Sequence, residues 1–221
     1  MQSNFTSVFF DLDGTLADTA PDLASATNKM LIDRNLDPIS LSELRPLASS
    51  GARGMIYRAF QLTPEDDQYE NMRLEFLNNY EHAIHVHTTF FPCVEELLTT
   101  LENQNIPWGI VTNKHQRFTS VLMQSMGLDL RTKAIVSGDT TANAKPHPEP
   151  LLYAAKLLDT DPSTSVYIGD DLRDIQAGRA AGMKTIAAAY GYCGNDEPTH
   201  DWQADYIAYH PKDLMTILFS Q

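Results

Sequence analysis

One stretch constrains this 221-residue chain more than any other: Val8–Thr15, which reads VFFDLDGT. Its first three residues form a short apolar run that is typical of a buried strand in a parallel sheet. Asp11 and Asp13 follow directly, with Gly14 behind them. Because ligands of such sheets bind outside the carboxyl ends of the strands, two carboxylates at this point indicate chemistry. The alternative interpretation is an ordinary Asp-Gly turn after a strand.

Length and charge narrow the class of protein. A chain of 221 residues accommodates one large domain, or one domain that carries a smaller insertion. Its 16 basic residues are scattered among 29 acidic ones, and the net charge of −13 argues against nucleic acid or an anionic membrane as a partner. An anionic small molecule would therefore need a local positive arrangement, for which a metal ion is the obvious candidate.

Cysteine usage and the N-terminus predict a cytoplasmic protein. Cys93 and Cys193 form no CxxC pattern, which indicates unpaired thiols in a reducing compartment. The N-terminus has no basic region followed by an apolar stretch, and no apolar run approaches roughly 18 residues. We expect neither a secretory signal nor a membrane partner, and a monomer or homodimer.

An all-helical block follows the first motif. A helix is predicted from about Thr19, which can cap it, to Arg34, with Pro21 in its first turn. No strand-like segment appears before Thr88, and three more helices are predicted. They cover Ser40–Arg45, Ala52–Leu62 and Glu65–Ala83. We interpret residues 18–88 as an inserted helical cap domain, with residues 1–17 and 89–221 forming the core domain.

Beyond Phe91 the pattern alternates between helix and strand. Strands are predicted at Trp108–Val111, Ala134–Val136, Val166–Ile168 and Thr185–Ala189. Helices are predicted at Pro92–Gln104, His115–Met126, Glu149–Leu158, Leu172–Ala181 and Pro211–Phe219, after an irregular tail from Gly191 to His210. This alternation predicts an α/β fold: a Rossmann-like, three-layer core with a parallel sheet covered on both faces.

More polar residues fall at or after the predicted strand ends. Thr112 and Asn113 follow GIV, Asp170 follows VYIG, and Asp174 lies one helical turn later. Lys145 precedes a proline in a loop. Because the carboxyl ends of parallel strands meet at one edge of the sheet, we expect these side chains to converge.

Each of these residues also has an interpretation without catalysis. Thr112 could cap a helix, Lys145 could be a solvated lysine, and Asp170 and Asp171 could cap the helix that follows them. The conjunction of all of them at one edge of the sheet favours a joint site.

Charge arithmetic then indicates what such a site requires. Asp11, Asp13, Asp170 and Asp174 would place up to four negative charges close together. Two like charges about 4 Å apart cost on the order of 4 kcal/mol at an effective dielectric constant of 20. Hard oxygen ligands favour Mg²⁺, and Lys145 adds a fixed positive charge. We expect a site for a phosphoryl group.

Four segments carry a family resemblance. DLDGT, VTN, AKPHPEP and GDDLRD resemble, in this order, the four motifs of the haloacid dehalogenase superfamily of phosphatases. The helical insertion is similar to the cap of that superfamily. APDLA and SSGARGM resemble its phosphoglycolate phosphatase branch, whereas WGIVTNK, GDDLRDI and YGY resemble the branch that acts on N-acetylmuramic acid 6-phosphate. The resemblance implies a Mg²⁺-dependent phosphomonoesterase acting through an aspartyl-phosphate on a small, carboxylate-bearing phosphate ester.

The resemblance also implies roles for the acidic residues. Asp11 would be the nucleophile, and Asp13 would protonate the leaving alkoxide and then activate water. Mg²⁺ would bind the Asp11 carboxylate, the Asp13 carbonyl and Asp170, with Asp174 as an orienting carboxylate. Asp171 departs from the family pattern, in which a small residue is common, and this leaves open whether Asp171 or Asp174 is the third metal contact.

The remaining motif residues would handle the phosphoryl group. The resemblance implies that Thr112 and the N–H of Asn113 bind phosphoryl oxygens, and that Lys145 steadies both the nucleophile and the phosphate. A carboxylate attacks a dianionic ester only when such cations offset the repulsion.

The cap offers a second candidate region. Ser49–Gly54 lies where a loop is predicted to enter a helix. The backbone N–H groups at Gly51 and Ala52, together with the Arg53 guanidinium, could hold a substrate carboxylate. We expect Arg53 to set substrate preference, although an exposed helical arginine is the plain alternative.

Three other activities share parts of this pattern. A dehalogenase releases halide without a proton and has no use for Asp13, which favours phosphate chemistry. A sugar-phosphate mutase on the same scaffold would return the phosphoryl group to a sugar. A phospho-receiver module, which is no enzyme, also uses Asp, Thr and Lys with Mg²⁺, but it is about half as long and has no cap.

Overall fold

The computed structural model describes residues 3–194 and 197–219, so the two ends of the expected core domain and two residues of the tail lie outside the described residues. The strands are β1 (Ser7–Phe10), β2 (Ala17–Asp18), β3 (Thr89–Phe90), β4 (Trp108–Val111), β5 (Ala134–Val136), β6 (Ser165–Gly169), β7 (Lys184–Ala188) and β8 (Tyr206–Ala208). The helices are α1 (Ala20–Ile32), α2 (Leu41–Leu44), α3 (Gly51–Phe60), α4 (Tyr69–His82), α5 (Val94–Asn103), α6 (Gln116–Ser125), α7 (Glu149–Leu158), α8 (Leu172–Ala180) and α9 (Asp213–Phe219).

A six-stranded parallel sheet forms the core, in the order β5-β4-β1-β6-β7-β8. β1 is fully buried at its centre, as its run of apolar residues predicts. Phe10 lies opposite Ile110 of β4 and opposite Ile168 of β6. This register brings the residues that follow these three strands to the same edge.

Helices cover both faces of the sheet. Phe9 packs into one apolar cluster with residues of α7 and α8, whereas Val8 and Phe10 pack into another with residues of α5, α6 and α9. Successive side chains of a strand point to opposite faces, so one strand supplies both clusters. The α/β, three-layer architecture expected from the sequence is confirmed.

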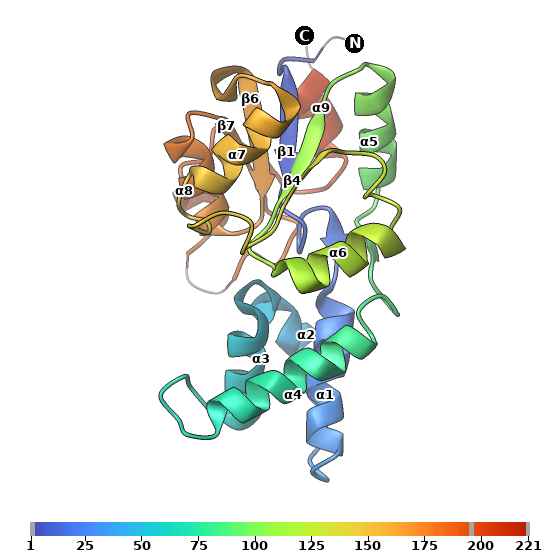
Figure 1. The fold of residues 1–221 in the computed structure, drawn as a ribbon, viewed down its shortest axis with the longest axis vertical. Helices are drawn as coiled ribbons and strands as arrows, with labels where there is room; N and C mark the ends of the chain where they lie inside the picture. Colours follow the sequence, from blue (N-terminus) through green and yellow to red (C-terminus); the bar gives the residue numbers. More distant parts are fainter. Residues whose placement is uncertain (1–2, 195–196, 220–221) are drawn as a thin grey trace.

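Helices α1 to α4 gather at one end of the molecule, below the sheet, and the start of β1 and helix α9 lie at the opposite end (Figure 1). The chain enters and leaves this helical end through β2 and β3, which pair antiparallel. The Asp22 carboxylate, in the first turn of α1, accepts hydrogen bonds from the backbone N–H groups of His87 and Thr88. It also accepts one from the Thr88 hydroxyl. This buried carboxylate ties the exit of the helical end to its entry.

Three local predictions were wrong, and one strand pair was not predicted. The crossing to the helical block contains the strand pair β2–β3, and the tail contains β8; both are two- or three-residue strands, too short to show a period in sequence. α4 begins at Tyr69 because Asp66 binds the N–H and hydroxyl of Thr63 and forms a turn instead. Thr19 precedes α1 but its side chain does not cap it.

None of the helices in the two described ranges is both long enough and apolar enough to span a bilayer.

Candidate active site

Three neighbouring strands end at the same place. Asp11 follows β1, Thr112 follows β4 and Asp170 follows β6, and the Asp11 N–H donates to the Ile168 carbonyl at 2.8 Å. Asp174 joins them from the first turn of α8. Oxygens of Asp11, Asp170 and Asp174 all lie within 4.8 Å of one another, and all three residues are buried.

Lys145 lies at the centre of this cluster. Its ammonium is 2.9 Å from Asp11 Oδ1 and 2.7 Å from Asp174 Oδ1, and its side chain is 2% exposed. It also donates to the Val111 carbonyl at 2.9 Å and to the Tyr167 hydroxyl at 2.8 Å. Every donor position of the ammonium therefore has an acceptor, which fixes its place beside Asp11. Tyr167 has no motif of its own, and the sequence showed it only as a strand residue.

The loop that carries Lys145 is held by Asn113. The amide nitrogen of Asn113 donates to the Lys145 carbonyl at 2.9 Å, and the amide oxygen accepts the Lys145 N–H at 3.0 Å. Thr112 is buried next to it, and its hydroxyl accepts the Lys114 N–H at 3.1 Å. The Asn113 side chain thus holds the loop of Lys145. The group of Asn113 that we expect to bind a phosphoryl oxygen is its backbone N–H.

Asp13 lies beside Asp11 but outside the cluster of three carboxylates. Its Oδ1 accepts hydrogen bonds from the Thr19 hydroxyl and from the Lys114 ammonium, the latter at 2.7 Å. The Lys114 ammonium also lies 5.0 Å from the centroid of the Tyr80 ring of α4. Burial alone would lower the pKa of Lys114, but Asp13 and Tyr80 together outweigh burial and raise this pKa. The sequence analysis missed Lys114, although it directly follows the VTN motif.

Burial dominates the electrostatics of the carboxylate cluster. Burial raises the pKa of Asp11 to about 7. The charge of Lys145 lowers this pKa and the charge of Asp174 raises it further. Burial and the neighbouring charges of Asp11 and Asp174 also raise the pKa of Asp170 well above its usual range. The single ammonium of Lys145 leaves this cluster short of positive charge. An all-oxygen donor set with this deficit fits a hard divalent cation.

Asp171 takes no part in the cluster. It is the N-cap of α8, where its side chain accepts the Arg173 N–H at 2.9 Å and pairs with the Arg173 guanidinium. Asp174 completes a capping box by accepting the Asp171 N–H at 3.1 Å. Of the two candidates for the third metal contact, the structure therefore brings Asp174 to the cluster.

Glycines let the chain pass close to Asp170. A side chain on Gly14, where φ is +80°, would place its Cβ 2.1 Å from Asp170 Oδ2. A Cβ on Gly191 would lie 2.4 Å from the Asp170 Cβ. The glycine of DLDGT and that of YGY are thus both required by close packing against one carboxylate.

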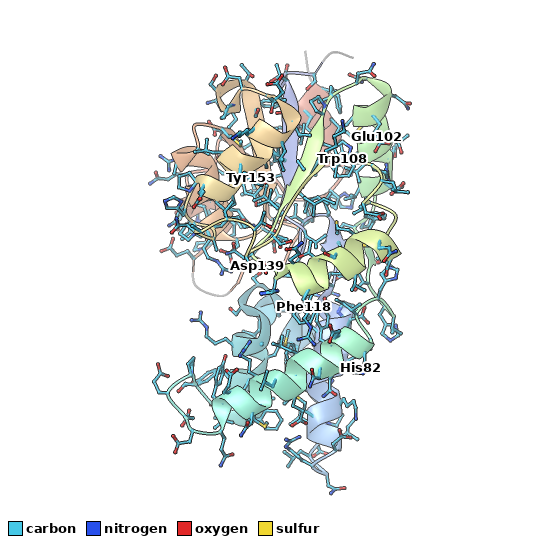
Figure 2. All side chains as sticks on the ribbon, in the orientation of Figure 1. His82, Glu102, Trp108, Phe118, Asp139 and Tyr153 are labelled. Atoms are coloured by element: carbon cyan, nitrogen blue, oxygen red, sulfur yellow. The ribbon has the colours of Figure 1, made fainter. Side chains whose placement is uncertain are left out.

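A cavity of about 470 Å³ opens between this cluster and the helical end. Asp11, Asp13, Thr112, Asn113 and Lys145 line it from the sheet. From the helical end come Gly51, Ala52 and an apolar wall that includes Leu74, Phe76 and Leu77. Phe118 of α6 lies at the boundary of the two parts and contacts Tyr80, with 5.6 Å between ring centroids (Figure 2).

Arg53 occupies a different position from the one expected. Its exposed side chain lines a neighbouring cavity of about 400 Å³, which shares Ser50, Asp171 and Arg173 with the first. Successive residues of a helix point about 100° apart. The turn of α3 that directs Ala52 to the larger cavity therefore directs Arg53 away from it.

Magnesium should stabilise the protein, and more strongly as the pH rises. Folding raises the pKa of Asp11 to about 7. The contribution of such a carboxyl group to the stability of the folded state is fully present below its unfolded pKa of about 3.9, and it is lost as the pH rises through 7. A bound cation removes this loss. We expect the increase in Tm with Mg²⁺ to be larger at pH 8 than at pH 5.5, by differential scanning calorimetry. An increase that shrinks with rising pH would contradict the site.

Comparison with known proteins defines the class. A family model described as haloacid dehalogenase-like hydrolase matches residues 8–188, so the chain belongs to that family. Two N-acetylmuramic acid 6-phosphate phosphatases are 42% and 43% identical to the chain. The protein from Pseudomonas putida is 42% identical over 97% of this chain and 96% of its own length. The protein from Pseudomonas aeruginosa is 43% identical over 96% of this chain and 94% of its own length. The chain is a phosphoric monoester hydrolase.

A second group of relatives has another name. A phosphoglycolate phosphatase of Xanthomonas campestris pv. campestris is 43% identical over 94% of this chain and 94% of that protein. Among solved structures, one described as a predicted phosphoglycolate phosphatase from Haemophilus somnus 129pt superposes with a TM-score of 0.85. It is 26% identical and covers 98% of this chain and 99% of that one. The names of relatives therefore support two substrates about equally.

Proposed function

We propose that this phosphatase hydrolyses N-acetylmuramic acid 6-phosphate through an aspartyl-phosphate on Asp11. The observation that carries the proposal is the position of Asp11. Its carboxylate lies beside the Lys145 ammonium, at 2.9 Å, and lines a cavity large enough for a substituted sugar.

The chain's own residues divide the reaction between them. Asp11 attacks the phosphorus atom while Lys145 offsets the approach of two anions. Thr112 and the Asn113 N–H hold phosphoryl oxygens. Asp13 protonates the leaving alkoxide, a poor leaving group without a proton, and then takes a proton from the water that hydrolyses the aspartyl-phosphate. The two steps return Asp11 and Asp13 to their starting states.

Magnesium is the cation that we propose for the carboxylate cluster. The Asp11 carboxylate, the Asp13 carbonyl and Asp170 would hold it, with Asp174 orienting the cluster from α8. When bound, Mg²⁺ neutralises charge on the phosphoryl oxygens and supplies the positive charge that burial of these carboxylates demands.

The size of the cavity supports the larger of the two substrates. Ligand pockets for molecules of drug size enclose roughly 300–1,000 Å³, and this one measures about 470 Å³. A two-carbon ester such as 2-phosphoglycolate would leave most of this volume to water. A pyranose with an N-acetyl group and a lactyl ether would fill it, and its methyl groups would meet the wall that Leu74 and Leu77 supply.

Two buried hydroxyl groups support a polyfunctional leaving group. Ser49 Oγ and the Tyr80 hydroxyl are buried and have no partner at hydrogen-bond geometry in the part of the chain that the structure describes. Both residues line the larger cavity. Unpaired polar groups of this kind cost free energy, and a sugar offers the hydroxyl and carbonyl groups to pair with them. The lactyl carboxylate could lie at the N-terminus of α3, near Gly51 and Ala52.

2-Phosphoglycolate remains the second candidate, because relatives of equal identity carry the name phosphoglycolate phosphatase. We expect kcat/KM for N-acetylmuramic acid 6-phosphate to exceed that for 2-phosphoglycolate by at least tenfold, or roughly 1.4 kcal/mol in transition-state binding. Phosphate release measured side by side in Mg²⁺ tests this. A preference for the two-carbon ester would overturn the proposed substrate.

The same assay separates the related activities. A sugar-phosphate mutase would form an isomeric sugar phosphate instead of inorganic phosphate. A dehalogenase would release halide from a 2-haloacid, and a phospho-receiver module would stop at a stable phospho-aspartate. Catalytic release of inorganic phosphate excludes all three as the main activity.

The Tyr80 hydroxyl gives a test of the cap contacts. Tyr80→Phe removes a buried hydroxyl that interacts with the Lys114 ammonium but has no partner at hydrogen-bond geometry among residues 3–194 and 197–219, so we expect the free energy of unfolding to change little. KM for N-acetylmuramic acid 6-phosphate should rise roughly tenfold, the loss of about one hydrogen bond. Arg53→Ala is the control, because Arg53 lines the other cavity and KM should stay within twofold. A large effect of Arg53→Ala alone would restore the expectation from the sequence.

We further propose that residues 18–88 act as a cap domain that closes over the substrate. Two observations support this proposal. Across the described part of the chain, the polypeptide passes between the sheet and the helical end only through the paired strands β2 and β3, and the cavity lies between the sheet and the helical end. In this proposal the enzyme works in the cytoplasm, where free thiols such as Cys93 and Cys193 persist.

A further inference from the structure

Tyr192, the last residue of the YGY segment, lies against Thr19 and Ala20, where the chain enters the helical end. Its hydroxyl oxygen accepts the Thr19 N–H at 2.7 Å and the Ala20 N–H at 2.9 Å. It lies 3.1 Å from Asp18 Oδ1, to which it can donate. The side chain is 5% exposed, and burial raises the pKa of Tyr192, so the phenol keeps its proton.

These bonds give α1 an unusual cap. The first N–H groups of a helix need acceptors, and a threonine at the N-cap commonly supplies its own hydroxyl. Here the Thr19 side chain makes no capping bond. Instead, the Tyr192 phenol satisfies two of these N–H groups from 173 and 172 residues away in sequence.

The phenol also lies 3.4 Å from the Thr19 hydroxyl, which has a further partner. Thr19 is fully buried, and its hydroxyl donates to Asp13 Oδ1. Asp13 Oδ1 also accepts from Lys114, so two donors fix one oxygen of this carboxylate. The other carboxylate oxygen is left for the substrate.

The segment of Tyr192 also contacts the metal cluster. The Tyr192 N–H donates to Asp170 Oδ2 at 2.8 Å, and Gly191 passes so close that a Cβ would overlap Asp170. Asp18 in turn pairs with Arg45 of the helical end at 2.7 Å, whose guanidinium lies 5.9 Å from the Tyr192 ring centroid. Tyr192 therefore contacts both Asp170 and Thr19, the residue at the entry to the helical end whose hydroxyl binds Asp13.

We propose that Tyr192 is a positioning residue for acid catalysis: its phenol binds the Thr19 and Ala20 N–H groups and contacts the Thr19 hydroxyl, which fixes Thr19 so that its hydroxyl orients Asp13 toward the leaving-group oxygen. The proposal rests on the proposed role of Asp13 as the acid. Without the phenol, Thr19 loses the acceptor that fixes its backbone N–H, and its hydroxyl is no longer held on the Asp13 carboxylate.

The test compares leaving groups. The alkoxide of a sugar phosphate needs a proton to leave, whereas p-nitrophenolate does not. We expect Tyr192→Phe to lower kcat/KM for N-acetylmuramic acid 6-phosphate roughly tenfold, a part of what general acid catalysis contributes. For p-nitrophenyl phosphate the loss should stay below about twofold, because kcat/KM ends with transfer to Asp11 and needs no acid.

The chain offers a matched control. Tyr190→Phe removes a phenol two residues earlier, one that donates to the Thr15 carbonyl at 3.0 Å and, within the described residues, hydrogen-bonds neither Thr19 nor Asp13. It should leave the ratio of the two substrates unchanged. Thr19→Val should reproduce the contrast of Tyr192→Phe, and Thr19→Ser, which keeps the hydroxyl, should restore the ratio.

The outcomes separate this inference from the proposed function. Equal losses on both substrates in Tyr192→Phe would assign the phenol a structural role only and overturn the inference, as would no loss on either. Asp13→Asn reports on the proposed function itself. If Asp13→Asn shows the leaving-group contrast and Tyr192→Phe does not, the inference alone fails; if Asp13→Asn shows none, both fail.

Discussion

Asp11→Asn should abolish turnover while leaving the fold intact. An amide of the same shape cannot attack phosphorus, so we expect kcat to fall by on the order of 10⁴-fold or more, as for the loss of other enzyme nucleophiles. The substitution also removes a charge that burial penalises, because burial raises the pKa of Asp11 to about 7. Without metal, Tm should therefore hold or rise. Phosphate release and thermal denaturation in a chelator measure the two effects.

The pairing of these two effects is specific. A destabilised, inactive Asp11→Asn would indicate a structural carboxylate, and an active one would remove Asp11 from the chemistry. Asp171→Asn is a suitable comparison, since Asp171 caps α8 and lies outside the cluster. Asparagine caps a helix about as well as aspartate does, so this variant should lose little stability and little activity.

Lys145→Met should lower both stability and activity. The ammonium is buried between Asp11 and Asp174, and a methionine of similar length leaves these carboxylates without their partner. Breaking a buried ion pair in this way costs about 3–5 kcal/mol. We expect a loss of this size in the free energy of unfolding at pH 8, measured in urea, together with loss of turnover. The loss should be smaller at pH 5, below the raised pKa of about 7 of Asp11, where the Asp11 carboxyl group binds a proton.

A second substitution tests the cause. Adding Asp174→Asn to Lys145→Met should recover part of the stability, because one of the stranded charges is gone. Lys29→Met is the surface control: its pair with Asp33 is more than half exposed on the lysine side, and its removal should cost at most about 0.5 kcal/mol. Equal losses in both lysine variants would contradict the role of the buried ammonium.

The motif residues could be predicted because a parallel sheet has a simple geometry. Apolar runs located β1, β4 and β6, and the residue after each run then falls at one edge of the sheet. Asp11, Thr112 and Asp170 follow from this rule, and Asp174 follows from helical spacing. Each of these positions depends on a local pattern and one topological rule.

The remaining site residues depend on contacts that no local pattern contains. Tyr192 meets Thr19 across 173 residues, and Lys114 meets Asp13 across 101. Arg53 was placed at the substrate from its proximity in sequence to Gly51, but the turn of α3 directs its side chain elsewhere. Which side chain of a helix end faces a cavity depends on how the helix packs, and the sequence does not specify that rotation.

Trapping the covalent intermediate tests the central claim most directly. Acid quenching during turnover, followed by reduction with borohydride and peptide mass spectrometry, converts an aspartyl-phosphate into homoserine at the residue that carried it. We predict homoserine at position 11 when substrate and Mg²⁺ are present, and none when either is omitted. Homoserine at another aspartate, or phosphate release with position 11 unmodified at every quench time, would contradict nucleophilic attack by Asp11.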